Sequence, residues 1–260
     1  MKQRAFTLIE LLVVIAVIAL LLAILTPALQ NSKRHVKTLL CSSNIKQLLF
    51  GLTMYENENN VFPHSWHLSL SKRAMGDPLY ERVGLWWLNY ITDYSKDKNN
   101  EKSILWCPSR RIDYFRFKTN VLAGNYGVNQ SICKISTARQ SQSEFSGTPL
   151  SSSEIQHPNQ TLLLVDSGYT MINWWHAADE PPETFGSFVE DNAYIPGLSI
   201  NRNKILRPGR EEDGFYGRHP NKTVNVGFVD GHVSREKAES LLVEKTGNGY
   251  KNCKPLWQPN

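Results

Sequence analysis

The chain is organised by its N-terminal stretch, Ala5-Phe6-Thr7-Leu8-Ile9-Glu10-Leu11-Leu12-Val13-Val14-Ile15. From Phe6 to Leu25 there are twenty residues, and Glu10 is the only one of them that carries a charge. At about 1.5 Å per residue, a helix of this length crosses the roughly 30 Å of hydrocarbon in a bilayer. The stretch therefore predicts a membrane-spanning helix, preceded by a basic leader that contains Lys2 and Arg4.

Glu10 is the anomaly in this apolar stretch. A carboxylate at the centre of a bilayer costs about 2.5–3.5 kcal/mol on insertion scales, so it calls for a partner. The alternative is a Glu10 side chain that lies near the membrane edge and reaches the interface.

Two other interpretations of the N-terminus stay open. A secretory signal peptide with an exit site at Thr26-Pro27-Ala28 is one, and a plain signal anchor is the other. Basic residues flank the stretch on both sides, so the positive-inside rule leaves the orientation undecided. These residues are Lys2, Arg4, Lys33, Arg34 and Lys37.

The helix is predicted to continue past Pro27, where a proline can kink it. Beyond Pro27, apolar residues recur at steps of three and four, which indicates an amphipathic helix whose apolar stripe needs a sheet to cover it. They are Val36, Leu39, Leu40, Ile45, Leu48, Leu49, Leu52 and Tyr55. The polar residues 57–60 end the helix, so we expect it to span 6–59.

Length and charge bound the rest of the chain. Of 260 residues, about 200 follow the helix, enough for one globular head at 60–260. The net charge is +5, two of these charges lie in the leader, and no block of Lys and Arg follows. We therefore expect no nucleic-acid partner.

The head is predicted to be of the α+β class, an antiparallel β-sheet with long loop insertions. Residues 161–166 form an apolar run that favours a strand buried on both faces, and residues 223–229 alternate as a second strand. Asp230-Gly231 indicates a hairpin turn before His232. Residues 237–245 are predicted as a short amphipathic helix, residues 141–153 as an exposed excursion and residues 168–213 as a variable insertion.

Few polar residues suggest chemistry. His219, Asp230 and His232 could form a site with two histidines and one carboxylate, but the predicted strand of about 33 Å separates His219 from the other two. We therefore expect a hairpin turn and a hydrogen bond at the strand entry. Within the insertion, residues 179–191 form an acidic stretch without a calcium-loop pattern, made of Asp179, Glu180, Glu183, Glu190 and Asp191. No nucleophile elbow, Walker loop or dinucleotide fingerprint occurs, so we expect no catalysis, cofactor or metal.

The residues from Lys2 to Leu12 resemble the N-terminus of type IV prepilins and of the pseudopilins of type II secretion. The resemblance implies that a prepilin peptidase cuts between Ala5 and Phe6 and methylates Phe6. It also implies that Glu10, fifth in the mature chain, pairs with the Phe6 ammonium of a neighbouring subunit. The family usually has Gly where this chain has Ala5, and it commonly has a proline at the depth of Pro27.

A second resemblance extends across the chain, to pseudopilin-like proteins abundant in planctomycete-type bacteria. It is carried by four motifs: Cys41-Ser42-Ser43-Asn44-Ile45-Lys46-Gln47, Trp106-Cys107-Pro108-Ser109, Asn125-Tyr126-Gly127-Val128-Asn129, and His219 followed by Asp230-Gly231. The family places nine residues between that His and Asp, whereas ten intervene here.

Four cysteines allow up to two disulfides in the oxidising compartment that this resemblance implies. The favoured pairs are Cys41 with Cys107 and Cys133 with Cys253, and buried reduced thiols stay an alternative. No Cys-x-x-Cys pair occurs, so neither zinc nor a thioredoxin-like role is expected.

The resemblances together imply a structural subunit of a type II secretion or type IV pilus-like fibre. Its partners would be a prepilin peptidase, other pilin or pseudopilin subunits and an inner-membrane assembly platform. It would cross the inner membrane once, with its head in the periplasm, and then join the fibre. The alternative is a pilin-anchored adhesin or glycan-binding module, because Trp174 and Trp175 in the insertion could stack on sugar rings.

Overall fold

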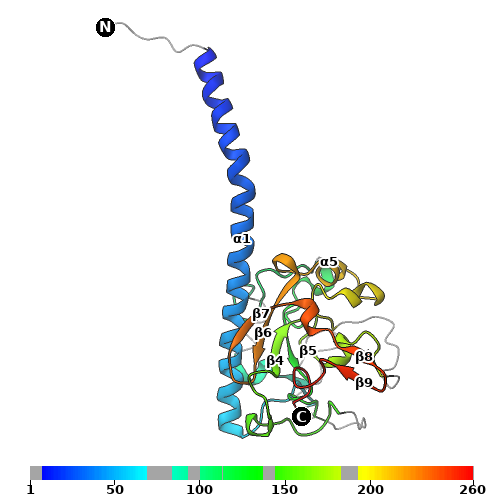
Figure 1. The fold of residues 1–260 in the computed structure, drawn as a ribbon. Helices are drawn as coiled ribbons and strands as arrows, with labels where there is room; N and C mark the ends of the chain where they lie inside the picture. Colours follow the sequence, from blue (N-terminus) through cyan, green and yellow to red (C-terminus); the bar gives the residue numbers. More distant parts are fainter. Residues whose placement is uncertain are drawn as a thin grey trace.

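The protein consists of one long helix and a head that packs beside the C-terminal half of that helix (Figure 1). The structure is a computed structural model, which describes residues 8–68, 84–92, 100–112, 114–136, 144–182 and 193–259. The N-terminal half of the helix projects away from the head, and the C-terminus lies within the head. The α+β fold class predicted from the sequence is confirmed.

Helix α1 (Leu8–Asn59) runs through Pro27 as one element. Figure 1 shows a gentle bend along it rather than a sharp break. The helix ends where the polar residues predict, because Asn60 adopts a left-handed conformation (φ 62°) and donates its N–H to Glu56 O at 2.7 Å. Asparagine tolerates this conformation better than most residues, so it ends a helix well.

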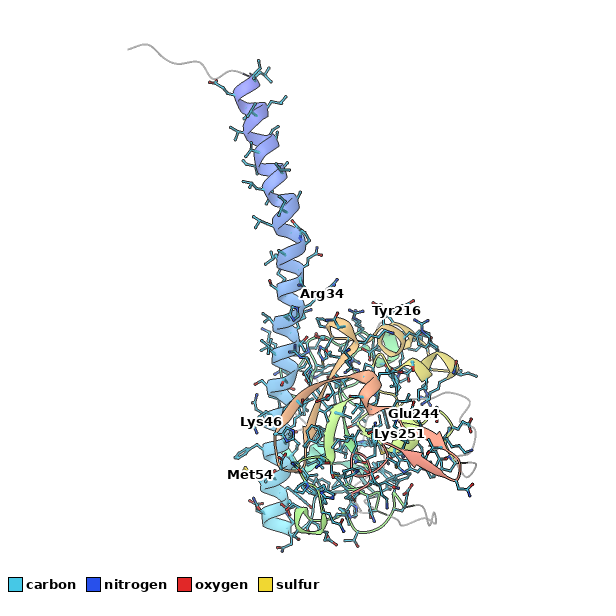
Figure 2. All side chains as sticks on the ribbon, viewed as in Figure 1. Arg34, Lys46, Met54, Tyr216, Glu244 and Lys251 are labelled. Atoms are coloured by element: carbon cyan, nitrogen blue, oxygen red, sulfur yellow. The ribbon has the colours of Figure 1, made fainter. Side chains whose placement is uncertain are left out.

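The head packs against one stripe of α1. The buried residues of the helix all lie in its C-terminal half, at the predicted spacing of three and four; they are Thr38, Cys41, Ile45, Leu48, Leu49, Leu52 and Glu56. In Figure 2, Arg34 marks the level at which the helix leaves the head. Lys46, outside the stripe, donates to Gly231 O of a hairpin at 2.5 Å.

The main sheet has five strands in the order β5-β3-β4-β6-β7. Four are antiparallel to their neighbours, but β5 runs parallel to β3, so the sheet is mixed rather than purely antiparallel as expected. The strands are β3 (Tyr126–Asn129), β4 (Leu162–Asp166), β5 (Met171–Ile172), β6 (Thr223–Phe228) and β7 (Val233–Lys237). Every residue of β4 is buried, which confirms the strand predicted there.

Strand β6 separates two apolar clusters. Val224, Val226 and Phe228 point into the cluster on the face away from α1, which also contains Trp257. Gly227 lies on the other face, where α1 approaches so closely that a Cβ there would lie 2.5 Å from Leu49 Cδ1. The close packing of helix on strand therefore depends on the missing side chain.

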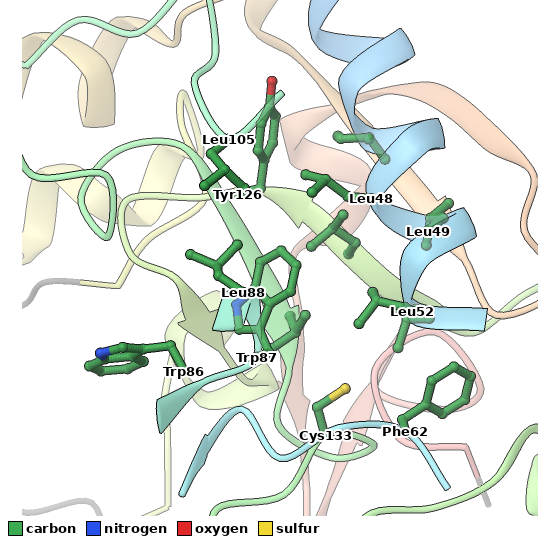
Figure 3. Close-up of a cluster of buried hydrophobic side chains, with 14 of the residues drawn as sticks. Leu48, Leu49, Leu52, Phe62, Trp86, Trp87, Leu88, Leu105, Tyr126 and Cys133 are labelled. Carbon is green, nitrogen blue, oxygen red and sulfur yellow. The ribbon is translucent and has the colours of Figure 1, made fainter. Parts of the chain in front are cut away.

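The second cluster fills the space between α1 and the sheet. Figure 3 shows Leu48, Leu49 and Leu52 of α1 directed at the side chains of the head, among them Trp87 and Tyr126. Two short strands, β1 (Trp66–Leu68) and β2 (Gly84–Trp86), pair beside it. Helix α2 (Leu88–Ile91) follows β2 and packs on α1.

The remaining elements are short. They are α4 (Phe115–Lys118), η1 (Ser152–Glu154), η2 (Trp174–Ala177), η3 (Ser199–Asn203), α5 (Glu211–Tyr216), η4 (Pro220–Lys222), η5 (Ala238–Leu241), β8 (Glu244–Thr246) and β9 (Gly249–Lys251). Strands β8 and β9 form a separate hairpin.

Two local predictions are wrong. Residues 237–245 form the end of β7, a 3-10 turn and the start of β8 rather than an amphipathic helix, because pairing with β6 extends β7 through Lys237. In the described part of the serine-rich segment, Phe145, Pro149 and Ser151 are buried, so residues 144–153 are no exposed excursion. The hairpin at Asp230-Gly231 is confirmed between β6 and β7.

Candidate functional site

The N-terminal half of α1 is an uncovered apolar surface. Every residue from Leu8 to Lys37 is exposed, and the apolar window long enough to cross a membrane has none of its residues buried. These thirty residues extend about 45 Å, more than the roughly 30 Å hydrocarbon core. Glu10 lies in the first turn of this half. Ala5 and Phe6, where cleavage and methylation are predicted, lie outside the described residues.

A buried polar centre lies where the other half of α1 meets the sheet. Three side chains from distant segments converge there: Cys41 of α1, Cys107 of the loop before α4, and His219 just before β6. Their sulfur and nitrogen donor atoms all lie within 4.8 Å of one another, and all three residues are buried. One residue from each of three motifs that carry the second resemblance thus lies at this centre.

Asp166, the last residue of β4, holds His219 in position. His219 Nε2 lies 3.0 Å from Asp166 Oδ2, which also accepts the backbone N–H of Asn225 at 2.7 Å. The Asn225 amide Nδ2 contacts the same carboxylate oxygen at 3.1 Å. His219 Nδ1 makes no hydrogen bond of normal length within the described part of the chain. One edge of the imidazole is therefore fixed by Asp166 and Asn225, and the buried Nδ1 is not.

The electrostatics of the centre follow from burial and from these contacts. Burial alone would lower the pKa of His219, but the adjacent Asp166 carboxylate raises this pKa to about 9. Burial would raise the pKa of Asp166, but His219 and Arg218 hold it below its ordinary value. Burial raises the pKa of the Cys107 thiol well above its usual range, and the Cys41 thiol adds to the effect. The pair is therefore imidazolium and carboxylate beside a protonated Cys107 thiol.

Arg218 anchors the centre to the rest of the head. It forms a two-point ion pair with Asp213 of α5, Nε to Oδ1 at 3.1 Å and Nη2 to Oδ2 at 2.6 Å. It also donates to the carbonyl oxygens of Asn125 at 2.8 Å and Ser167 at 3.1 Å. Both side chains of the ion pair are fully buried. The free-energy cost of burying a guanidinium is offset when hydrogen-bond acceptors surround its N–H groups. If the carboxylate partner is removed, the guanidinium charge is left buried without compensation.

Two asparagines tie the motifs together. Asn44, one turn after Cys41, donates from Nδ2 to Trp106 O at 3.0 Å and contacts the Tyr126 hydroxyl at 3.2 Å. Asn125 accepts the backbone N–H of Cys107 at 2.9 Å. The Asn of the Cys41 motif and the Asn before β3 therefore hold the Cys107 loop against α1 and the sheet.

The structure does not bring His219 together with Asp230 and His232. His219 is buried before β6, whereas Asp230 and His232 pair with each other after it, at 2.6 Å between Oδ1 and Nδ1, and their side chains are partly exposed. The length of β6 separates the two groups. A metal-dependent site built on all three residues is thereby excluded. Instead, His219 makes the hydrogen bond predicted at the entry to the strand, and Asp230 and His232 lie in the predicted hairpin turn.

All four cysteines are free and buried. Cys41 and Cys107 are neighbours, while Cys133 lies in the apolar cluster beside α1 and Cys253 in the cluster on the other face of the sheet. The structure thus brings together one favoured pair and not Cys133 with Cys253. A disulfide between Cys41 and Cys107 stays a prediction.

The tryptophans of the insertion serve packing. Trp174 is buried, donates from Nε1 to Glu144 at 2.9 Å and packs edge-on against Tyr250 with ring centroids 4.6 Å apart. Trp175 is half-buried against Phe145. Of the acidic residues there, Asp179 accepts the backbone N–H of Lys245 and Glu180 pairs with the side chain of Lys245. Glu183, Glu190 and Asp191 lie outside the described residues.

The sequence reasoning missed Asp166, Asp213 and Asn225 as members of the centre. One signal was available: Asp166 ends a run that the sequence predicts to be buried on both faces, and a buried carboxylate requires partners. Antiparallel pairing of β4 with β6 places Asp166 at the level of Asn225, next to Arg218 and His219.

Comparisons with known proteins give one motif match at the N-terminus and one curated relative. Residues 1–26 match the prokaryotic N-terminal methylation motif. A stretch of 79 residues is 29% identical to type II secretion system core protein G of Pseudomonas aeruginosa, over 30% of this chain and 56% of that protein. The chain thus spans little more than half the length of this curated relative. No solved structure matches.

These findings support the pilin-like and pseudopilin assignment that the N-terminal sequence predicts. The N-terminus carries the methylation motif, and the long apolar helix that overlaps this motif fits an inner-membrane-anchored protein. The similarity is to a structural subunit class, and the adhesin or glycan-binding alternative is not favoured. The likeness to planctomycete-type proteins stays a prediction.

Proposed function

We propose that this protein is a pilin-like structural subunit, a pseudopilin, which assembles through the N-terminal half of α1 into a type II secretion or type IV pilus-like fibre. The observation that carries the proposal is the uncovered apolar surface of α1 from Leu8 to Leu29. A helix that is apolar on all sides needs lipid or other helices around it. Before assembly that surrounding is the membrane, and after assembly it is the same half of neighbouring subunits.

Processing would precede assembly. The proposed cut between Ala5 and Phe6 by a prepilin peptidase removes Lys2 and Arg4 and frees the amino group of Phe6, which is then methylated. The methylation motif at residues 1–26 supports this step. Loss of the two basic residues also removes charges that would hold the N-terminus at the membrane surface.

Glu10 is proposed to make assembly specific. Its carboxylate lies in the first described turn of α1, four residues after Phe6 in the sequence. In a helix bundle, the free amino group of Phe6 of one subunit and Glu10 of the next would neutralise each other in an apolar surrounding. A charge pair that forms between neighbouring subunits favours the assembled state and a fixed register.

The head is proposed to lie in the periplasm, with the leader in the cytoplasm and an inner-membrane platform driving assembly. In this arrangement the head decorates the fibre and the chain performs no catalysis. The packing of Trp174 into the head supports a structural role for the insertion. The proposed domains are the leader at 1–5, the helix at 6–59 and the head at 60–260. The end of α1 at Asn59 supports the second boundary.

The experiment compares Glu10→Ala with Glu58→Ala in cells that carry the assembly system. Glu58 is an exposed acid at the far end of the same helix, which makes it a matched control. We expect both variants to insert into the membrane and to be processed normally. Incorporation into sheared fibres should fall at least about tenfold for Glu10→Ala, the equivalent of about 1.4 kcal/mol, and should stay at the wild-type level for Glu58→Ala. Normal incorporation of Glu10→Ala would refute the pairing role.

A further inference from the structure

The buried group of Cys41, Cys107 and His219 is not used by helix assembly. We propose that these three residues, here called the Cys-Cys-His cluster, bind a soft divalent metal ion of the zinc class through both sulfurs and His219 Nδ1. The proposal revises the expectation of no metal, which rested on the absence of closely spaced ligands in the sequence. It is independent of the proposed function, since it concerns the head and not the exposed helix.

The spacing of the donor atoms fits a single ion. Two sulfurs bound to one zinc ion lie no more than about 4.6 Å apart, twice the Zn–S bond of about 2.3 Å, and a sulfur and a nitrogen lie closer still. The donor atoms of the cluster lie within 4.8 Å of one another, and the cysteines are unbonded thiols. A small closure of the side chains would therefore complete the site.

The surroundings of His219 prepare it to be a ligand. Nε2 is engaged by the Asp166 carboxylate at 3.0 Å, so this nitrogen keeps its hydrogen, and Nδ1 presents a lone pair once its own proton has been displaced. Nδ1 makes no normal hydrogen bond among the described residues, although it is buried. A carboxylate that accepts from the far nitrogen of a metal-bound histidine is a recurring arrangement that orients the ring and strengthens the ligand.

The donor set selects the class of metal. Thiolate and imidazole ligands suit zinc and other soft or borderline ions, whereas calcium and magnesium require several oxygens. The ion would displace one proton from each thiol and one from Nδ1, and these protons leave to solvent. The two thiolates then balance a divalent charge. Three protein ligands leave one position of a tetrahedral ion for water or a small ligand.

The cluster would fasten the helix to the head. Its ligands come from α1, from the loop before α4 and from the entry to β6, segments that are 66 and 112 residues apart in the chain (107 − 41 and 219 − 107). An ion that binds only the folded arrangement stabilises it, and closing long loops gains more than closing short ones.

The first experiment measures the full-length chain as the cell makes it. The chain is extracted in detergent with a thiol-alkylating reagent present from lysis, and zinc content and intact mass are determined. We expect one zinc ion per chain, with Cys41 and Cys107 resistant to alkylation until a chelator is added. A disulfide between Cys41 and Cys107 would overturn the proposal. So would a zinc-free chain that, when its thiols are intact, takes up neither Zn²⁺ nor Co²⁺.

The second experiment uses variants with matched controls. Cys41→Ser, Cys107→Ser and His219→Gln should lose the bound zinc, whereas Cys133→Ser should keep it, because Cys133 is equally buried in the same apolar cluster but away from His219. Equal zinc in all four variants, or equal loss, would contradict the site.

The third experiment weakens the support of His219 without removing a ligand. Asp166→Asn should lower the affinity for Zn²⁺ by about 10- to 100-fold. Asp230→Asn disrupts an equivalent carboxylate–histidine contact at the exposed hairpin and should leave the affinity unchanged. Competition with a chelator of known affinity reports both constants on folded protein, and wild-type affinity in Asp166→Asn would refute the orienting role. Should these variants fail to fold, Co²⁺ added to the metal-stripped wild-type chain gives the answer: visible thiolate-to-cobalt bands support the site, and their absence overturns it.

Discussion

The two halves of α1 differ in both composition and surroundings. From Leu8 to Lys37 every residue is exposed, whereas from Thr38 onward one stripe is buried to 0–9% exposure against the head. From Leu8 to Leu29 the helix is apolar on nearly all sides, and from Thr38 onward it has an apolar face and a polar face. One uninterrupted helix is thus adapted to two environments. Its first half suits lipid or other helices, and its second half packs against its own head.

This difference separates the energetics of assembly from those of folding. Substitutions in the first half are expected to change fibre formation with little effect on the head, because the side chains there are exposed. Residues in the second half and in the polar centre determine the stability of the head. Each substitution at a buried position is compared with the same type of substitution at an exposed position. The free energy of unfolding is measured on the full chain in detergent by near-ultraviolet circular dichroism.

The largest effect is expected at the buried ion pair. Arg218→Met leaves the Asp213 carboxylate buried without its partner and removes the two hydrogen bonds to the carbonyl oxygens of Asn125 and Ser167, so the free energy of unfolding should fall by about 3–5 kcal/mol. Arg34→Met changes an exposed arginine where the helix leaves the head, and it should stay within about 0.5 kcal/mol of wild type. Similar values for the two variants would contradict the central role of Arg218.

A comparable but smaller effect is expected for leucine truncation. Leu48 is fully buried in the cluster between α1 and the sheet, so Leu48→Ala should cost about 2–5 kcal/mol of head stability. Leu20→Ala removes the same atoms from the exposed half and should leave head unfolding within about 0.5 kcal/mol of wild type. A destabilised head in Leu20→Ala would show that the first half of α1 contacts the head after all.

The smallest effect concerns the approach of strand to helix. Gly227→Ala places a Cβ 2.5 Å from Leu49 Cδ1 and 2.9 Å from Ile45 Cγ2, so α1 and β6 must separate, at a cost of about 1–3 kcal/mol. Gly249→Ala, in the β8–β9 hairpin, meets nothing closer than 4.0 Å and should have no such cost. Wild-type stability in Gly227→Ala would indicate looser packing than the structure shows.

Local patterns predicted the elements well. The stripe at Ile45, Leu48 and Leu52 has the period of a half-buried helix, and Asp230-Gly231 marks its hairpin because few other residues fit that turn. The pattern failed at 237–245, where strand pairing overrode a helical period. It could not indicate that β5 runs parallel to β3, since direction depends on a neighbour far along the chain.

The polar centre lay beyond what local reasoning can predict. His219 pairs with Asp166, 53 residues earlier, and not with Asp230, which is nearer in sequence. Cys41 and Cys107 approach His219 only because α1 crosses the sheet at β6. The contacts among residues of the polar centre depend on strand order and helix packing, which do not appear as a repeating pattern in a single sequence. The motifs indicated Cys41, Cys107 and His219, and the structure shows that these residues lie together beside Asp166.

The most direct test of the central claim is mass spectrometry of the mature N-terminal peptide from cells with an active prepilin peptidase. If the exposed half of α1 is an assembly helix, the peptide should begin at Phe6 and carry one methyl group. A chain that keeps residues 1–5, or one trimmed near Ala28, would contradict the assignment, because neither would present the Phe6 amino group to Glu10 of a neighbouring subunit.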